Sequence, residues 1–452
     1  MFPLLHWLAL LFIYGLLIVK ACLEFIPHWD FIAYHLPCAL LRYSLTTFTP
    51  NQKIQAVCDG FPPLTQIVQG GLVFLTSRLE SANLINTLGL VIALLVIRFV
   101  FGRRFHYRWF LTSLLAIPMF LLQLSTGYVD VWASMLIVAA FTICLKSSEE
   151  KVTMSELLLF VACVSAATLA RYQTWGASAV LSGFMIIEVF RQKHFSKNEM
   201  LVFLTLLFIG LSSWAIRNTL HFGNPTHPAS PPFVSTLLKN QDFALNVEKD
   251  SKKNTPTFLQ ETPPVIRFVV SAFELNRLLP SKHPYKWTLD QAVNIETNLS
   301  PHHRLGGWSF LTFFTLLLSL CNSFKNHRIP RRLLVVMLLV VLSIAILKPS
   351  HELRYSLFIP FILCLIFART MNLKSRKELL LEKALISISL IFSISNLNIF
   401  TIKPRSPNNS APPHAVAYWE AETKNSCIYA SYVDALFYAG PTFNEYPVTL
   451  CK

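Results

Sequence analysis

The sequence has few charged residues and few glycines, and both shortages narrow the possible folds. Only 14% of the 452 residues are charged and only 14 residues are glycine, whereas 53% are hydrophobic. This composition excludes a disordered or a fibrous chain. An ordinary soluble globule is also excluded, because it has no way to bury so many helices that are apolar all round. The composition therefore indicates a polytopic membrane protein.

Apolar runs near the length of a membrane crossing recur along almost the whole chain. They predict an all-α fold with about eleven transmembrane helices. The predicted crossings are residues 3–19, 82–101, 109–125, 130–145, 155–170, 175–190, 200–217, 307–324, 332–348, 355–371 and 384–400. The first run has no basic segment before it, so we expect a retained helix rather than a cleaved signal peptide.

The distribution of positive charge predicts how the chain is oriented. The formal net charge is +15, but Lys and Arg gather in short clusters between the apolar runs, so we expect no nucleic-acid partner. Such clusters mark cytoplasmic loops, and they fall on one side when the N-terminus is cytoplasmic. We therefore expect a bacterial inner-membrane protein whose active site and C-terminus lie on the periplasmic side.

Two long polar segments, about 20–80 and 218–306, are expected to be outer loops of a membrane domain over residues 1–400. Residues 401–452 would form a small C-terminal tail on the outer side. Residues 62–75 open with two prolines and have an interrupted apolar pattern, which fits an amphipathic helix on the outer surface. Candidate acceptor contacts in the second loop, for which a solvated loop residue is the simpler alternative, are Phe273, Trp287, His302 and His303.

The nine cysteines divide into two groups by their place in this topology. Those inside predicted crossings are expected to be buried apolar thiols, namely Cys144, Cys163, Cys321 and Cys364. The others lie in outer segments, where an oxidising compartment would allow disulfides. The pairs that we expect, from a choice that the spacing leaves open, are Cys38–Cys58 and Cys427–Cys451.

The first candidate site follows the first crossing. If this segment is helical, Asp30 and Tyr34 lie one turn apart on the same face, with His35 beside them. A carboxylate near an imidazole can accept a proton or hold a divalent cation. An interfacial belt of aromatic residues is the alternative interpretation.

Two further candidate sites lie at predicted helix ends on the outer side. Asp130 follows Tyr128 and Val129 at the hairpin before the fourth crossing, where its carboxylate could instead cap the helix. Arg217 and His227 flank a Gly-Asn-Pro turn that opens the second loop. The end of a helix followed by a turn explains the residue types in that segment, except for its arginine and its two histidines.

The fourth candidate site is the hairpin before the tenth crossing, where His351, Arg354 and Tyr355 come close together in the sequence. A guanidinium at the mouth of an apolar helix suits phosphate oxygens, and the phenol adds a donor. An ion pair with Glu352 or snorkelling to the interface is the alternative. Arg171 is another outer-side cation that could serve a phosphate, although it also fits an interfacial turn.

In this order and on this side of the membrane, the four segments resemble a family pattern. The pattern consists of an outer-loop Asp followed by Tyr-His-x-Pro, a Tyr-Val-Asp hairpin, Gly-Asn-Pro-x-x-Pro, and a late His-x-x-Arg-Tyr. It resembles the GT-C superfamily of integral-membrane glycosyltransferases, which includes the protein O-mannosyltransferases and the aminoarabinose transferases. Phe31 stands where the mannosyltransferases have a second acidic residue, so the sugar is not predicted.

The resemblance implies transfer of a sugar from a polyprenyl-phosphate carrier to an acceptor on the outer face. It implies that Asp30 is the base or orients the acceptor, that Asp130 is the second acidic residue near the reaction centre, and that Arg354 with Tyr355 lies near the carrier phosphate. A single displacement would invert the anomeric carbon. The acceptor is unknown, whether glycan, lipid or protein.

Two questions stay open from the sequence alone. A divalent cation could be held by Asp30, Asp130 and His35, but these residues have no fixed ligand spacing, so no cofactor is assigned. The alternative function is a transporter or flippase of a lipid-linked sugar or an anionic solute. A transporter should have ionisable residues near the middle of its crossings, whereas here they gather at the outer boundary.

Overall fold

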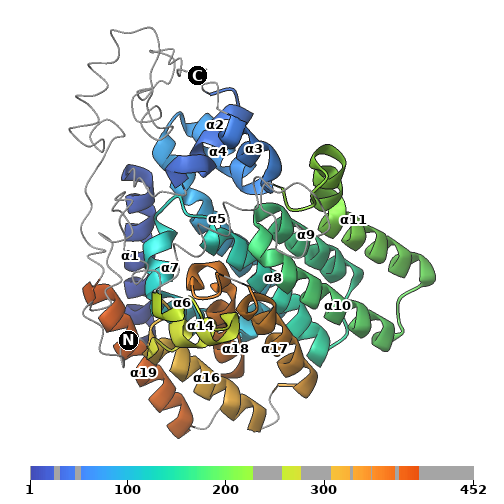
Figure 1. The fold of residues 1–452 in the computed structure, drawn as a ribbon. Coiled ribbons are helices and arrows are strands. Elements are labelled where there is room, and N and C mark those ends of the chain that lie inside the picture. Colours follow the sequence, from blue (N-terminus) through green and yellow to red (C-terminus); the bar gives the residue numbers. More distant parts are fainter. Residues whose placement is uncertain are drawn as a thin grey trace, which may run out of the picture.

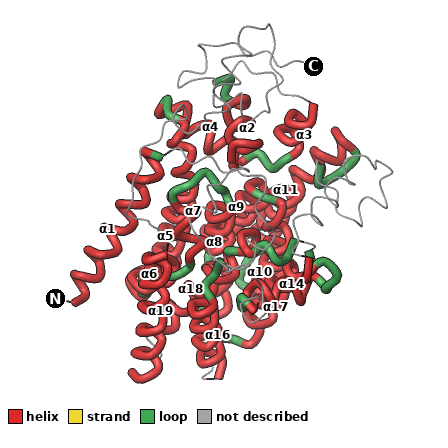
Figure 2. The backbone as a smooth tube through the Cα atoms, turned by 60° about the vertical axis from the view of Figure 1, so that its left-hand side comes forward, coloured by secondary structure: helices red, strands yellow, loops and turns green. Residues whose placement is uncertain are grey.

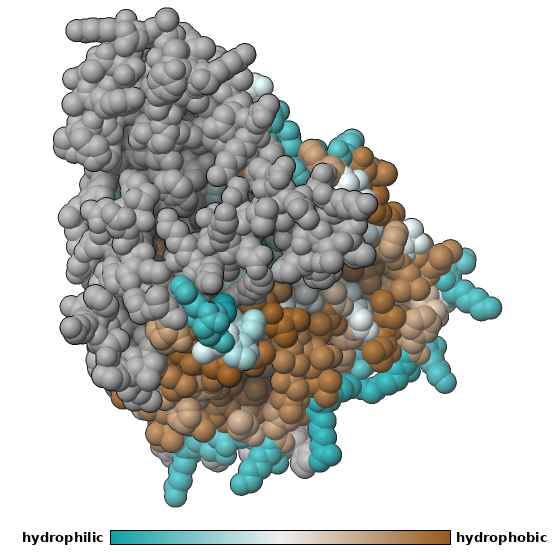
Figure 3. All heavy atoms as spheres, in the orientation of Figure 1, coloured by the Kyte–Doolittle hydropathy of each residue, from teal (hydrophilic) through white to brown (hydrophobic). Residues whose placement is uncertain are grey.

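The computed structural model describes residues 2–24, 31–45, 52–227, 257–275, 307–325, 329–347, 349–371 and 376–396. These residues form helices joined by loops and turns, and Figure 2 shows no strand among them. The described surface has a broad apolar band that is bordered by hydrophilic side chains (Figure 3). The predicted polytopic all-α membrane fold is therefore confirmed.

Helices coincide with the predicted crossings. Ten of the runs correspond to one helix each, namely α1 (Phe2–Leu23), α5 (Ile85–Phe101), α8 (Asp130–Glu149), α9 (Met154–Ala170), α10 (Trp175–Gln192), α11 (Lys197–Phe222), α16 (Phe310–Lys325), α17 (Arg331–Ala345), α18 (Phe358–Thr370) and α19 (Arg376–Asn396). Among the described residues, four helical segments are long and apolar enough to cross a membrane unaided, namely Leu4–Leu23, Leu79–Arg104, Asp130–Glu149 and Lys197–Phe222. The other helices are shorter or less apolar.

The third predicted crossing, residues 109–125, is not one continuous helix. It consists of α6 (Tyr107–Leu115) and α7 (Pro118–Leu124), which meet at an angle of 92°. The break precedes Pro118, which has no N–H to donate and disfavours a helical residue before it. The Ala116 carbonyl at the break accepts hydrogen bonds from Thr312 at 2.8 Å and Ser393 at 3.1 Å. These hydroxyls come from α16 and α19, so neighbouring helices satisfy the interrupted backbone.

Helix α8 lies at the centre of the bundle. The apolar window of α8 is 94% buried, whereas that of α11 is only 11% buried. Helix α8 contacts α5, α9, α10 and α18 along the bundle. Its first residue is Asp130, so the second candidate acidic residue stands where this enclosed helix begins.

A small group of helices covers the end of the bundle at which α8 begins. It contains the turn η1 (Phe31–His35), α2 (Leu36–Arg42), α3 (Gln52–Gly60) and α4 (Leu64–Thr76). Figure 1 shows α2, α3 and α4 together at one end of the molecule. Helix α4 is the helix predicted for residues 62–75, and its Thr65 donates to the Ala170 carbonyl of α9 at 3.0 Å. We call this end, marked by Asp130, Arg171 and Arg354, the site end.

Ion pairs between helices mark the opposite end of α8, which we call the far end. They are Lys146–Glu156 at 2.5 Å, Glu188–Arg332 at 3.3 Å and Glu149–Arg369 at 2.6 Å. Capping boxes also start two helices near this end, with Thr153 and Glu156 at α9 and Ser196 and Glu199 at α11. At the far end, ion pairs therefore hold the helices together in addition to apolar packing.

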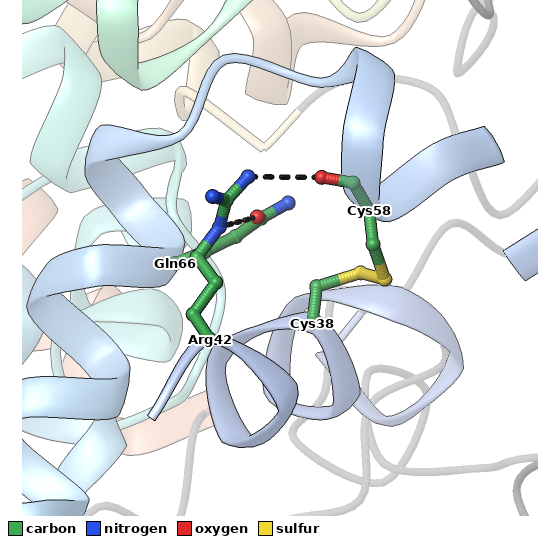
Figure 4. Close-up of a disulfide and its surroundings, with 4 residues drawn as sticks. All are labelled: Cys38, Arg42, Cys58 and Gln66. Atoms are coloured by element: carbon green, nitrogen blue, oxygen red, sulfur yellow. Dashed lines mark hydrogen bonds between the residues drawn. A yellow bond between two sulfur atoms is a disulfide. The ribbon is translucent and has the colours of Figure 1, made fainter. Parts of the chain in front are cut away.

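The cysteine predictions are largely confirmed. Cys38 and Cys58 form a disulfide between α2 and α3 (Figure 4). Cys144, Cys163 and Cys364 are buried free thiols, as expected. The prediction for Cys321 is wrong, because this thiol is exposed and lies outside the buried stripe of α16 that includes Leu316 and Ser319. The expected Cys427–Cys451 pair lies outside the described residues.

Candidate active site

A buried amide shapes the turn that leads into α8. The Asn86 Nδ2 of α5 lies 2.7, 3.0 and 2.5 Å from the carbonyl oxygens of Gln123, Thr126 and Tyr128. The Asn86 side-chain oxygen also accepts from the backbone N–H of Trp132 at 2.9 Å. One side chain therefore contacts the backbone at both ends of this turn, which helps to position Tyr128 and Asp130.

Gly127 lets η1 pack directly on the same turn. A Cβ atom at Gly127 would lie 2.3 Å from the ring of Phe31, so no larger residue fits without displacing that ring. Gln69 of α4 donates to the Gly127 carbonyl at 3.0 Å. The covering helices and the turn before α8 are thus in direct contact.

Asp130 is buried and already has partners for both carboxylate oxygens. It is 2% exposed, its Oδ1 forms an ion pair with Arg171, and its Oδ2 accepts from Gln123 at 3.1 Å. The capping alternative is wrong, because the N-cap of α8 is Val129, and the first-turn N–H of Trp132 donates to Asn86 rather than to Asp130. Asp130 instead presents its carboxylate to Arg171, which immediately follows α9.

Two guanidinium groups share the ring of Tyr355. The Cζ of Arg171 lies 4.9 Å from the ring centroid and that of Arg354 lies 4.7 Å from it. Arg354 also donates to the Tyr355 hydroxyl at 2.8 Å and pairs with Glu352 at 3.2 Å. The ion pair proposed as the alternative for Arg354 is therefore present, and it coexists with the contact to Tyr355. Arg354 lies in a short helical turn and Arg171 immediately precedes another, so neither arginine lies within a long helix.

The site therefore unites segments far apart in the sequence. The ring of Tyr128, from the turn before α8, lies 5.5 Å from the Cζ of Arg354 in η8 (Leu353–Ser356). Arg171 precedes η4 (Tyr172–Thr174) and donates to Gln173 at 3.0 Å. Two carboxylates, two guanidiniums and two phenols thus converge at the site end.

Tyr34 and His35 lie beside this group, in η1. The Tyr34 ring is 5.4 Å from Phe61, which is 5.9 Å from the ring of Tyr172. His35 is buried, and its ring is tilted by 48° against that of Tyr34, with ring centroids 4.4 Å apart. Asp30 lies outside the described residues, so its place in the site stays a prediction.

Arg217 and His227 belong to a second group, around the end of α3. Arg217 donates to the Asp59 carbonyl at 2.5 Å, and its Cζ lies 4.6 Å from the Trp214 ring. The His227 ring stacks on Phe222 at 4.0 Å. Burial, and next the charge of Arg217, lower the pKa of His227, which favours the neutral imidazole. The structure gives both residues contacts with the backbone and with rings in this group.

His351 lies under a helix of the second loop. It is buried, and its carbonyl accepts from Ser271 of α14 (Pro264–Ala272) at 2.6 Å. Phe273, expected as an acceptor contact, packs 5.3 Å from Phe313 of α16. The other loop candidates, Trp287, His302 and His303, lie outside the described residues. Helix α14 thus holds the segment that precedes Arg354.

A metal site receives no support from the part of the chain that the structure describes. That part contains no group of three or more His, Cys, Asp or Glu side chains that could hold a metal ion. The cation suggested for Asp30, Asp130 and His35 therefore stays a prediction that depends on a residue outside the described ranges.

Sequence reasoning undervalued Arg171, named Tyr128 only as part of a motif, and missed Gln123 and Asn86 as members or supports of the site. The sequence feature that could have identified Arg171 as a site residue is its position between two apolar runs, where one run ends and the next begins. Nothing local in the sequence distinguished it from an ordinary interfacial turn.

The comparisons with known proteins concern the fold. No protein-family model matches the sequence, and no curated protein matches it. The structure is similar to the crystal structure of ArnT from Cupriavidus metallidurans bound to undecaprenyl phosphate, with a TM-score of 0.50 and 12% sequence identity. The match covers 98% of this chain and 75% of that chain. The predicted all-helical membrane fold is therefore confirmed as a fold similar to that of ArnT.

Proposed function

We propose that the protein is a GT-C glycosyltransferase that moves a sugar from a polyprenyl-phosphate carrier to an acceptor on the outer face of the membrane. The observation that carries this proposal is the grouping of Asp130, Arg171, Arg354 and Tyr355 at one end of an apolar helical bundle. The similar ArnT structure contains undecaprenyl phosphate, which is a carrier of this class.

The two arginines suit the leaving group of such a reaction. When the bond from the sugar to the phosphate breaks, negative charge develops on the phosphate, and preorganised cations stabilise it. Arg354 and Arg171 both lie within 5 Å of the Tyr355 ring centroid, so one phosphate near this ring could be reached by both guanidiniums. Arg354, with Tyr355 beside it, is the proposed main phosphate contact.

In the proposed reaction, the acidic residues act on the acceptor. An acceptor hydroxyl is a poor nucleophile until a base removes its proton. Asp130 already has a cationic partner in Arg171, which suits it to orienting the reactants. Asp30 is the proposed base, and a single displacement would invert the anomeric configuration.

The proposed location is the bacterial inner membrane, with a cytoplasmic N-terminus and with the site end facing the periplasm. The clustering of basic residues in short loops supports this orientation. A lipid-linked donor would then enter from the outer leaflet. The proposed partners are this donor, the membrane lipid and an acceptor whose identity is open.

The test is sugar transfer by the purified protein in lipid, with a panel of polyprenyl-phosphate sugars as donors. We expect release of carrier phosphate by the wild type, and loss of that release in Asp130→Asn and Asp30→Asn. Glu188→Gln is a matched control, because Glu188 is also a buried carboxylate that pairs with an arginine. Its transfer rate should stay close to that of the wild type.

Two outcomes would contradict the proposal. Equal transfer by Asp130→Asn and the wild type would remove Asp130 from the reaction. Movement of the lipid-linked sugar across the bilayer, without release of carrier phosphate for any donor, would favour the flippase.

A further inference from the structure

The last turn of α3 is held by side chains from distant parts of the chain. The Cys58 carbonyl accepts from Arg42 at 2.9 Å, and the Asp59 carbonyl accepts from Arg217 at 2.5 Å. The last carbonyls of a helix have no partner within it, and cations there also complement the helix dipole. Two arginines therefore bind the end of α3.

Gly60, the last residue of this turn, is the most heavily contacted. Its carbonyl lies 2.6 Å from the Tyr172 hydroxyl, 2.9 Å from Trp214 Nε1 and 2.9 Å from Asn218 Nδ2. Trp214 and Asn218 belong to α11, and Tyr172 belongs to η4. We call residues 58–60, together with the side chains that bind their carbonyls, the α3 anchor.

A disulfide ties the α3 anchor to α2. Cys58 is bonded to Cys38, and Arg42 lies one turn further along α2. Figure 4 shows Arg42 bridging the Cys58 carbonyl and the Gln66 side chain of α4, which it reaches at 2.6 Å. The anchor thus joins α2, α3, α4 and α11 by one covalent bond and several hydrogen bonds.

Tyr172 connects the α3 anchor to the candidate active site. Its hydroxyl lies 2.6 Å from the Gly60 carbonyl and 2.6 Å from the His227 carbonyl. Burial raises the pKa of the Tyr172 phenol, so the hydroxyl stays protonated and can donate. The preceding residue is Arg171, whose side chain pairs with Asp130. Tyr172 and Arg171, which are adjacent in the chain, therefore contact the α3 anchor and Asp130, respectively.

The backbone hydrogen bonds at this point are all local, with the Arg171 N–H donating to the Ala167 carbonyl at 3.1 Å and the Thr174 N–H donating to the Arg171 carbonyl at 3.3 Å. Helix α9 ends at Ala170, Arg171 is extended, and η4 has only three residues. Thr174 adds local hydrogen bonds to the carbonyls of Ala167 and Arg171, both at 2.7 Å. The Tyr172 hydroxyl supplies the long-range contact that sets this segment against α3.

We infer that Tyr172 is a positioning residue, which fixes η4 to the α3 anchor and thereby holds Arg171 against Asp130 and Tyr355. This inference rests on the proposed function for its effect on transfer, but its geometric content can be tested without turnover. A long arginine side chain has many rotamers, and small displacements at a reaction centre reduce rates strongly. Removal of the phenol oxygen should therefore lower transfer by about tenfold.

The experiment compares Tyr172→Phe with Tyr43→Phe. Tyr43 is a matched control, because its hydroxyl donates to a backbone carbonyl, that of Ile67, at 3.0 Å at the same end of the molecule. Tyr172→Phe should reduce transfer about tenfold and Tyr43→Phe less than twofold, with unfolding temperatures measured for both. In an Arg171→Gln background, Tyr172→Phe should add less than twofold, because the residue that it positions is gone.

A second measurement needs no donor. Phenylglyoxal labelling of arginine, read by mass spectrometry, reports how tightly Arg171 is held, since its side chain is only 11% exposed. Labelling of Arg171 should rise severalfold in Tyr172→Phe and stay unchanged in Tyr43→Phe. Labelling of Arg332 at the far end serves as the internal reference.

These readouts separate failure of the inference from failure of the proposed function. If Tyr172→Phe reduces transfer equally with and without Arg171, or leaves Arg171 labelling unchanged, the positioning role is wrong. If the wild type transfers no sugar but the labelling change appears, the geometric inference stands and the proposed function fails.

Discussion

Each end of the bundle contains a buried carboxylate paired with an arginine, yet the surroundings of the two pairs differ. At the far end, Glu188 of α10 pairs with Arg332 of α17, which also donates to the Ser148 carbonyl of α8 at 2.5 Å. At the site end, Asp130 pairs with Arg171, which lies over the Tyr355 ring beside a second guanidinium.

The difference teaches how to interpret buried charge in this protein. In the far-end pair, Glu188 lies near the end of α10 and Arg332 is the second residue of α17. With the Ser148 carbonyl of α8, the pair joins three helices, so packing accounts for it. The site-end groups lie in turns or at helix starts, supported by Asn86 and by the α3 anchor. Since turns on a rigid scaffold commonly carry function, the setting of a pair is more informative than its burial.

The largest contrast is expected when an arginine is removed from each end. Arg354→Ala should lower sugar transfer by about 10²–10³-fold, because it removes a donor that stabilises charge in the transition state. Arg332→Ala should change transfer less than twofold. Steady-state transfer assays on both purified variants measure the contrast. Comparable losses in the two variants would remove the functional distinction between the ends.

Reduction of the Cys38–Cys58 disulfide, which lies at the site end, should lower the stability of the protein. Loss of the Cys38–Cys58 bond should lower the free energy of unfolding by about 2–4 kcal/mol, chiefly because the unfolded chain is no longer cross-linked. Thermal unfolding with and without dithiothreitol measures this, and Cys38→Ser should reproduce it. Cys22→Ser, which removes a free thiol, is the control and should unfold like the wild type.

A smaller loss of stability, without loss of transfer, is expected at the far end. Glu188→Gln should lower the free energy of unfolding by about 1–2 kcal/mol, since Arg332 is partly exposed and keeps its bond to Ser148. Thermal unfolding measures it, with Glu150→Gln at an exposed position as control. A fall in transfer larger than the fall in folded protein would show that the far end takes part in the reaction.

The smallest effect is expected at a helix start near the far end. Ser196 caps α11, accepting from the Glu199 N–H at 3.2 Å, so Ser196→Ala should cost about 1 kcal/mol of stability. Ser196→Thr keeps the hydroxyl and should cost less. Sugar transfer should be unchanged in both variants, and a change would extend the functional region beyond the site end.

The sequence alone predicted the all-α membrane fold and the positions of the long apolar helices, but not the short helices α2, α3 and α14 in the outer segments. Apolar runs have to become helices in a bilayer, because the backbone can satisfy its hydrogen bonds there only within the segment or with neighbouring helices. The break before Pro118 was missed because a continuous apolar run conceals a bend whose Ala116 carbonyl is satisfied from α16 and α19. The domain boundary near residue 400 and the role of Asp30 stay predictions.

The sequence by itself determined which residue types stand at helix ends: Asp130, Arg171, Arg217 and Arg354 were all identifiable as polar groups at membrane boundaries. Only the tertiary structure decided which of them meet. Arg171 reaches Asp130 across 41 residues, whereas Arg217 binds the Asp59 carbonyl across 158 residues. A guanidinium near an apolar bundle needs a partner, and helix packing determines which partner lies within its reach.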